Sequence, residues 1–167
     1  MSRVLMFAVA LATAAVCGPV QAQPDTALRS SAHDPALIAA RKQARDTLPI
    51  FQAKFRAHAD DYSRFAVKAM FRTDDGRGEE ALWVAVFEMA DGKVRGRLAS
   101  APVAIKGLRP GQPVEFDASH VVDWQYVKGG HAYGHFSTRA LMARVSAAER
   151  AEAMSFLAPT PLEAGDR

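Results

Sequence analysis

The chain has 167 residues, of which 49% are hydrophobic and 23% are charged, and its formal net charge is +3. This length predicts a single domain, and this composition supports a packed core and excludes global disorder. The small positive charge is far from the dense Lys and Arg stripe of nucleic-acid-binding proteins, so we predict no nucleic-acid partner.

The first 22 residues have the pattern of a secretory signal peptide. Arg3 supplies a positive start, residues 4–16 form an apolar stretch, and Val20-Gln21-Ala22 provides a cleavage pattern. We therefore predict a periplasmic or secreted protein that is cleaved after Ala22. An uncleaved anchor is the alternative, but a transmembrane helix needs about 20 apolar residues. We predict no transmembrane segment after cleavage.

Cys17 is the only cysteine of the chain. A lipid-modified Cys17 is a second alternative to cleavage, which Val16 and Ala14 disfavour because they do not fit such a site. Cleavage after Ala22 removes Cys17, so the mature chain can form neither a disulfide nor a thiolate metal site.

The remaining chain divides into three parts by composition. Residues 23–33 are polar and predict a flexible lead, and residues 34–158 predict a single domain. Pro159 and Pro161 end the last helical pattern, so residues 159–167 are expected to form a disordered tail.

The domain is expected to begin with an amphipathic helix. Asp34 is a good helix cap, and Pro35 suits the first helical position. Apolar residues then recur at spacings of three and four as far as Phe55. Pro49 should bend this helix, or split it with Thr47 as a second cap.

Alternating or continuous apolar segments predict about five to six strands. Asp91-Gly92 is a strong hairpin signal, and a two-residue turn there pairs Glu88 with Arg95. One face of this hairpin has no polar side chain and is expected to point into the core; it comprises Trp83, Ala85, Phe87 and Met89, with Val94, Gly96 and Leu98. The expected strands are 65–71, 81–89, 93–98, 113–116, 121–127 and 131–136, and residues 101–106 are a candidate for a further short strand.

The strand at 121–127 is the one around which we expect the domain to be organised. Val122, Trp124 and Tyr126 share one face, which predicts a core face. Asp123 points the other way. A short helix at 138–145 and a last helix that opens with a Ser146 to Glu149 capping box are expected to follow.

Four motifs of the domain fall in order at plausible spacing. They are Phe65-Ala66-Val67-Lys68, Glu80 with Trp83-Val84, Asp123-Trp124-Gln125-Tyr126, and Gly134 with Thr138-Arg139. With these motifs, the stretch from Leu48 to Val145 resembles the bacterial family called domain of unknown function 2314, which includes the YegJ-like exported proteins. The resemblance implies an α+β fold, in which an N-terminal helix packs on a strongly bent antiparallel sheet, and it implies no established activity. Ala81 departs from the family pattern, which has His or another polar residue there.

Asp123 and Glu80 are the candidate acid–base pair, since two carboxylates can exchange protons if burial raises one pKa. The alternative, which we favour, is that Asp123 accepts main-chain hydrogen bonds while Trp124 fills the core. No nucleophile elbow, phosphate loop, dinucleotide motif or zinc-protease motif occurs in the sequence. We therefore assign no catalytic residue and predict no cofactor.

Histidines suggest a metal site, but their spacing opposes it. His131, Tyr133 and His135 are expected on one strand face. Two histidines four residues apart on a strand lie about 13 Å from each other, too far for both to bind one ion. We predict no bound metal, and expect surface or half-buried histidines.

Lys93, Arg95 and Arg97 share one face of a predicted strand. A solvated sheet face is the usual meaning of such a pattern, and a docking patch for an acidic partner or an anionic envelope surface is the functional alternative.

Two classes of function remain open. The first is a non-catalytic binding or interaction module of the periplasm, with an unknown envelope protein or acidic surface as partner. The second is a small envelope hydrolase that uses Glu80 and Asp123. The absence of a recognisable catalytic set favours the first. Its candidate binding residues are Asp123, Glu80, Lys93, Arg95 and Arg97.

Overall fold

Six extended segments pair into one antiparallel sheet in the computed structural model of this chain, which describes residues 34–57 and 59–166. Together with the helices, this sheet confirms the predicted α+β fold. The strand order β4-β3-β2-β1-β5-β6 places β1 between β2 and β5. The strands are β1 (Tyr62–Arg72), β2 (Glu79–Ala90), β3 (Lys93–Leu98), β4 (Pro113–Asp117), β5 (Val121–Lys128) and β6 (His131–Gly134).

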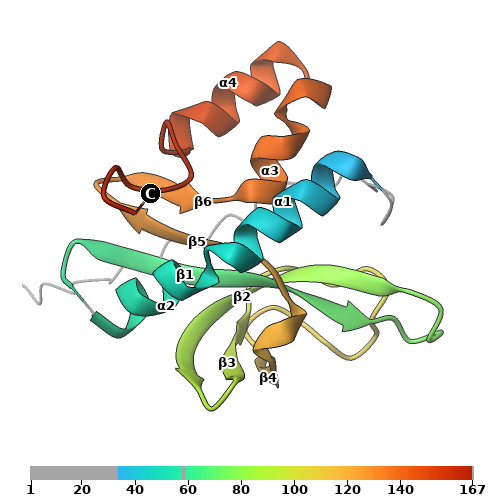
Figure 1. Cartoon of the computed structure of the whole chain (residues 1–167). Coiled ribbons are helices and arrows are strands. Elements are labelled where there is room, and N and C mark those ends of the chain that lie inside the picture. Colours follow the sequence, from blue (N-terminus) through green and yellow to red (C-terminus); the bar gives the residue numbers. More distant parts are fainter. Residues whose placement is uncertain (1–33, 58, 167) are drawn as a thin grey trace, which may run out of the picture.

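The helices gather toward the β5–β6 end of the sheet (Figure 1). α1 packs against both β5 and α3. No helix in the described part of the chain is long and apolar enough to cross a bilayer. The helices are α1 (Pro35–Asp46), α2 (Leu48–Ala57), α3 (Phe136–Leu141) and α4 (Ala147–Phe156), with 3-10 turns η2 (Ala118–His120) and η3 (Met142–Arg144).

The first helix begins and breaks near the predicted positions. The Asp34 side chain accepts a main-chain hydrogen bond at 2.9 Å, and Pro35 is the first helical residue. The helix splits at Thr47, two residues before Pro49. The Thr47 hydroxyl donates to the carbonyl oxygen of Gln43 at 2.7 Å, so it closes α1 and does not act as the expected cap of α2.

The β2–β3 hairpin has the predicted turn. Asp91 and Gly92 have φ angles of 51° and 73°, the left-handed conformations that a tight two-residue hairpin turn needs. Glu88 pairs with Arg95, and their side chains form an ion pair at 2.8 Å. Immediately before this pair, Phe87 has no partner on β3, so the strand bulges there.

This bulge reverses the predicted faces of β2. Because Phe87 adds one residue to the alternation, Val86 pairs with Gly96 and Val84 with Leu98. Phe87, which the sequence predicts in the core, is 55% exposed. The prediction that Trp83, Ala85 and Phe87 point into the core is therefore wrong; the β2 residues that pack in the core are Leu82, Val84, Val86 and Met89.

Trp124 lies at the centre of the core, fully buried. Its ring centroid is 5.7 Å from that of Phe51 in α2, 5.4 Å from that of Phe136 in α3 and 5.8 Å from that of Tyr126. Its indole N–H donates to the main-chain oxygen of Ala44 in α1 at 3.0 Å. The predicted core face of β5 is confirmed, and one side chain joins three helices to the sheet.

Two of the segments predicted as strands differ in the structure. Residues 101–106 form a loop, and β6 ends at Gly134, before the expected end at Phe136. Phe136 instead opens α3, which replaces the helix expected at 138–145. The predicted signal peptide and lead lie outside the described residues.

The predicted disordered tail also differs from the structure, which describes it as far as residue 166. Figure 1 shows this segment, in dark red, returning from α4 toward β6. The N–H group of Gly134 donates to the carbonyl oxygen of Pro161 at 2.8 Å, and Leu162 packs against the core. The segment is held by contacts with residues that are distant in sequence. The composition of the segment alone does not reveal these contacts.

Replacing Trp124 by Ala should cost about 3–5 kcal/mol, because the ring is fully buried. This is a large share of a typical domain stability of about 5–15 kcal/mol. Thermal melting checks the expectation, with Trp83→Ala, at a half-buried position, as the matched control. A Trp124→Ala protein that melts as high as Trp83→Ala would contradict it.

Candidate functional site

Glu80 and Asp123 lie on opposite faces of the sheet. Asp123 pairs with Lys68 of β1, whereas Glu80 pairs with Phe71, three positions farther along the same strand. Positions three apart on a strand point to opposite faces. Glu80 accepts main-chain hydrogen bonds from residues 103 and 104 at 2.7 and 2.9 Å, so it anchors a loop. The two carboxylates therefore share no acid–base site.

The Asp123 carboxylate is fully buried and caps α3. It accepts hydrogen bonds from the N–H groups of Trp124 (2.8 Å), Phe136 (3.0 Å) and Ser137 (2.8 Å), and from the Ser137 hydroxyl (2.5 Å). Burial raises the pKa of Asp123, whereas Lys68 and the Ser137 donors oppose that rise. Because donors surround both oxygens, this is a binding site for an ionised carboxylate of the chain itself.

Lys68 and His135 lie beside this cap. The Lys68 ammonium is 3.5 Å from the Ser137 hydroxyl and 5.0 Å from the ring centroid of Trp83, which also contacts the His135 ring at 5.1 Å. Burial, then the charges of Lys68 and Arg139, lower the pKa of His135 to about 3. The imidazole is therefore neutral at physiological pH.

His135 shows why the predicted histidine face is wrong. β6 ends at Gly134, and His135 turns away with a φ of 54°, a conformation that His tolerates better than most residues. Its ring is hydrogen-bonded to Gln125, whereas His131 is exposed. Within residues 34–57 and 59–166, no group of three or more His, Cys, Asp or Glu side chains is placed to hold a metal ion.

The predicted basic face on β3 exists, but acidic neighbours neutralise it. Lys93, Arg95 and Arg97 alternate with buried residues. Lys93 lies 2.8 Å from one carboxylate, Arg95 lies 2.8 and 2.6 Å from two others, and Arg97 bonds a main-chain oxygen. Three carboxylates thus balance three cations on an exposed surface. The acidic partners are Asp117, Glu88 and Glu115.

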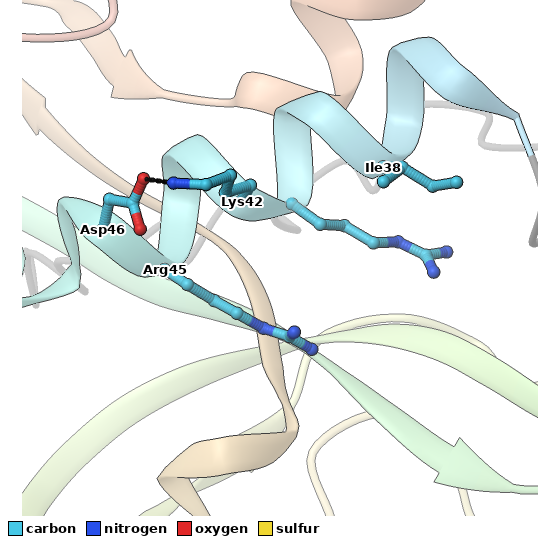
Figure 2. A pocket seen from close by; sticks show the side chains of 5 residues that line it. Ile38, Lys42, Arg45 and Asp46 are labelled. Carbon is cyan, nitrogen blue, oxygen red and sulfur yellow. Dashed lines mark hydrogen bonds and ion pairs between the residues drawn. The ribbon is translucent and has the colours of Figure 1, made fainter.

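A hollow of about 340 Å³ lies on the outer face of α1 (Figure 2). Figure 2 shows Lys42 paired with Asp46, at 2.6 Å, while Arg45 extends away from them. A second hollow of about 50 Å³ lies at the β2–β3 turn. Neither includes Glu80, Asp123 or a histidine, and the first is built from α1 alone. Its lining residues are Ile38, Arg41, Lys42, Arg45 and Asp46.

Four side chains from three elements form a different kind of site near the end of β5. Lys54 belongs to α2, Tyr62 to β1, and Tyr126 and Lys128 to β5. The Lys54 ammonium is 5.3 Å from the Tyr62 ring centroid and 5.7 Å from that of Tyr126, and Lys128 is 4.6 Å from Tyr62. These are cation–π distances. We name these four residues the lysine–tyrosine cradle.

The carboxylate of Glu163, which follows α4, fills the lysine–tyrosine cradle. It lies 2.7 Å from the Lys54 ammonium and 2.6 Å from that of Lys128. It also accepts hydrogen bonds from the hydroxyls of Tyr126 at 2.9 Å and Tyr62 at 3.0 Å. Four donors from three elements thus converge on one carboxylate, and two of them are cations that strengthen its hydrogen bonds.

These contacts shift the pKa values of the groups involved. Burial would raise the pKa of Glu163, but hydrogen bonds, first from Lys128 and then from Lys54, outweigh burial and lower it to about 2. Burial would lower the pKa of Lys54, but bonds to Glu163 and Asp166 raise it above its ordinary range. The Glu163 bond raises the pKa of Lys128. Burial, then Glu163, raise that of Tyr126.

The direction of these shifts sets a pH window for the network. The lowered pKa of Glu163 stabilises the fold fully above its ordinary value of 4.5, and this contribution is lost as the pH falls toward 2. The raised pKa of Tyr126 contributes below its ordinary value of 10.0 and is lost as the pH rises beyond it. Between pH 4.5 and pH 10.0, both contributions to the stability of the fold are therefore fully present.

Sequence reasoning misses the lysine–tyrosine cradle because its residues come from segments far apart in the chain. Tyr126 carries the available signal. Its position predicts a buried ring, and a buried tyrosine needs a hydrogen-bond partner for its hydroxyl. The partner, Glu163, lies in the segment that composition predicts as disordered.

An Asp123→Asn substitution should destabilise the protein by about 2–3 kcal/mol, because the amide nitrogen would point at groups that donate hydrogen bonds. Ser137→Ala is the matched control, which removes one hydroxyl from the same carboxylate and should cost about 1 kcal/mol. Chemical denaturation measures both. An Asp123→Asn protein that is as stable as the wild type would rule out the capping role.

Comparison with known proteins gives the family of the chain. A family model described as an uncharacterized protein conserved in bacteria (DUF2314) matches residues 34–156. Searches of the curated proteins and of the solved structures gave no match. The match covers most of the chain, including every strand and helix described above and all four residues of the lysine–tyrosine cradle. The chain belongs to the DUF2314 family of conserved bacterial proteins.

Proposed function

We propose that this protein is an exported, non-catalytic binding module of the periplasm, and that its lysine–tyrosine cradle recognises carboxylate groups of a ligand. The observation that carries the proposal is the carboxylate held there by Lys54, Lys128 and two tyrosine hydroxyls at 2.6–3.0 Å. A carboxylate has about four lone-pair positions, so four donors can satisfy it.

The electrostatics of the lysine–tyrosine cradle support binding over catalysis. A general base must be unprotonated near neutral pH. The pKa values of Lys54, Lys128 and Tyr126 all lie above their ordinary ranges, so these groups keep their protons and donate hydrogen bonds. Fixed positive charge with little tendency to titrate suits recognition of an anion.

The hydrolase alternative finds less support. It relies on Glu80 and Asp123, which lie on opposite faces of the sheet, and each already accepts hydrogen bonds from the chain's own main chain. A water molecule between two carboxylates, as a hydrolase of this kind needs, has no place in that geometry.

Binding of a short glutamate-rich peptide tests the proposed recognition. We expect Glu163→Gln, which removes the resident carboxylate, to bind a fluorescent peptide, and Glu163→Gln with Lys128→Gln to bind it at least about tenfold more weakly, because the charge partner is lost. Fluorescence anisotropy at several salt concentrations measures the affinity.

Lys42→Gln in the Glu163→Gln background is the matched control, since Lys42 is a lysine on the exposed face of α1. It should leave binding unchanged. Equal affinity of the Lys128→Gln and Lys42→Gln proteins would show that the lysine–tyrosine cradle does not bind the peptide.

Export rests on the pattern of residues 1–22 and has its own test. The protein purified from the cell envelope should begin at Gln23, after removal of the positive start and the apolar stretch. Cell fractionation followed by amino-terminal sequencing checks this. A protein found in the cytoplasm with Met1 intact would contradict export.

A further inference from the structure

We propose that residues 159–166 are a displaceable internal ligand of the lysine–tyrosine cradle, and that the external ligand is an acidic peptide segment of a partner protein. In this proposal, the peptide takes the place of residues 159–166 along the edge of β6. The inference rests on the proposed function and adds to it the class of ligand and a means of regulation.

The C-terminal segment approaches the sheet at an exposed strand edge, with strand-like pairing at Leu157 and Ala158 and one main-chain bond beyond them. β6 is an edge strand. Leu157 forms a parallel bridge with Ala132, and Ala158 N–H donates to the Ala132 oxygen at 2.9 Å. Farther along, Gly134 N–H donates to Pro161. Main-chain bonds at a sheet edge, combined with a side-chain pocket, are a recurrent mode of peptide recognition.

The segment divides into a fixed part and a looser part. Leu157 and Ala158 are 3% and 0% exposed, so they belong to the folded core. Each of residues 159–166 retains partial or full exposure to solvent. Residues 159–166 can therefore leave while Leu157 and Ala158 stay in place, and their departure uncovers the part of the core against which Leu162 packs.

The looser part contributes a second charge contact. The Oδ2 atom of Asp166 lies 3.0 Å from the Lys54 ammonium, so Asp166 forms an ion pair beside that of Glu163. A peptide whose carboxylates reach Lys54 and Lys128 can make the same contacts in place of the chain's own segment.

The family match separates the lysine–tyrosine cradle from its occupant. The match ends at residue 156, so β6 and the lysine–tyrosine cradle lie inside it, whereas the occupant, together with Leu157 and Ala158, lies outside it. The matched domain thus carries a complete recognition surface, to which the chain adds its own ligand.

The contacts define the chemistry of the external ligand. It needs a main-chain oxygen to accept from the Gly134 N–H group, an apolar residue in the place of Leu162, and a carboxylate in the place of Glu163. A second carboxylate three residues later, as at Asp166, would meet Lys54. An acidic peptide segment of a partner has these groups.

The test uses the full chain and a fluorescent peptide with the sequence of residues 158–166. We expect Glu163→Gln to bind this peptide at least tenfold more tightly than the wild type does. In the variant, residues 159–166 lack the Glu163 carboxylate and therefore compete poorly with the peptide for the lysine–tyrosine cradle. A peptide with Gln in place of the glutamate should bind neither protein. Light scattering shows whether the peptide binds a monomer, as expected.

Hydrogen exchange of residues 159–166 in the wild type gives a second measurement that requires no variant. Saturating peptide should accelerate it. Equal affinity for both proteins, with no change in exchange, would overturn the displacement and leave the proposed function standing. No binding to either protein would overturn the proposed function itself. A dimer that the peptide dissociates would identify a second copy's segment as the ligand, against our proposal.

Discussion

The fold depends on the close approach of Trp124 to Gly134. A Cβ atom at position 134 would lie 2.0 Å from the main-chain oxygen of Trp124 and 2.6 Å from its ring, so only glycine fits beside it. Gly134 also has a φ of 77°, which favours glycine. Because β6 can turn there, Phe136 packs edge-on against the indole, and α3 starts where the Asp123 carboxylate can cap it.

The same strand connects the core to the lysine–tyrosine cradle. The ring of Tyr126 stacks on Trp124 inside the core, while its hydroxyl donates to Glu163 at the surface. Lys128, two residues farther on β5, supplies one of the two ammonium groups. The backbone that carries two of the four cradle residues is therefore fixed by the packing around Trp124.

Local sequence signals predict much of this fold. The start of α1 at Asp34 and the turn at Asp91-Gly92 depend on a few adjacent residues, and the structure confirms both. The bulge at Phe87 does not follow from such signals, because β2 is apolar on both faces and either register offers apolar side chains to the core. The outcome depends on which side chains meet the helices, a property of the whole domain.

The candidate site depends even more on tertiary structure. Asp123 is recognisable from sequence as a special residue, but only the turn at His135 shows that its partners are the first N–H groups of α3. The lysine–tyrosine cradle unites α2, β1, β5 and the C-terminal segment, and no spacing rule connects them. A buried tyrosine hydroxyl and a charged tail are each unremarkable until they are seen together.

The place of β1 in the sheet has a consequence for the order in which the chain can fold. Strands β1 to β4 form a meander of neighbours in sequence, whereas β5, which pairs with the other edge of β1, follows some 50 residues after β1 ends. Contacts between distant segments form slowly because a long loop must close first. Until residue 121 becomes available, whether from the ribosome or from a translocation channel, one edge of β1 stays open to unwanted pairing.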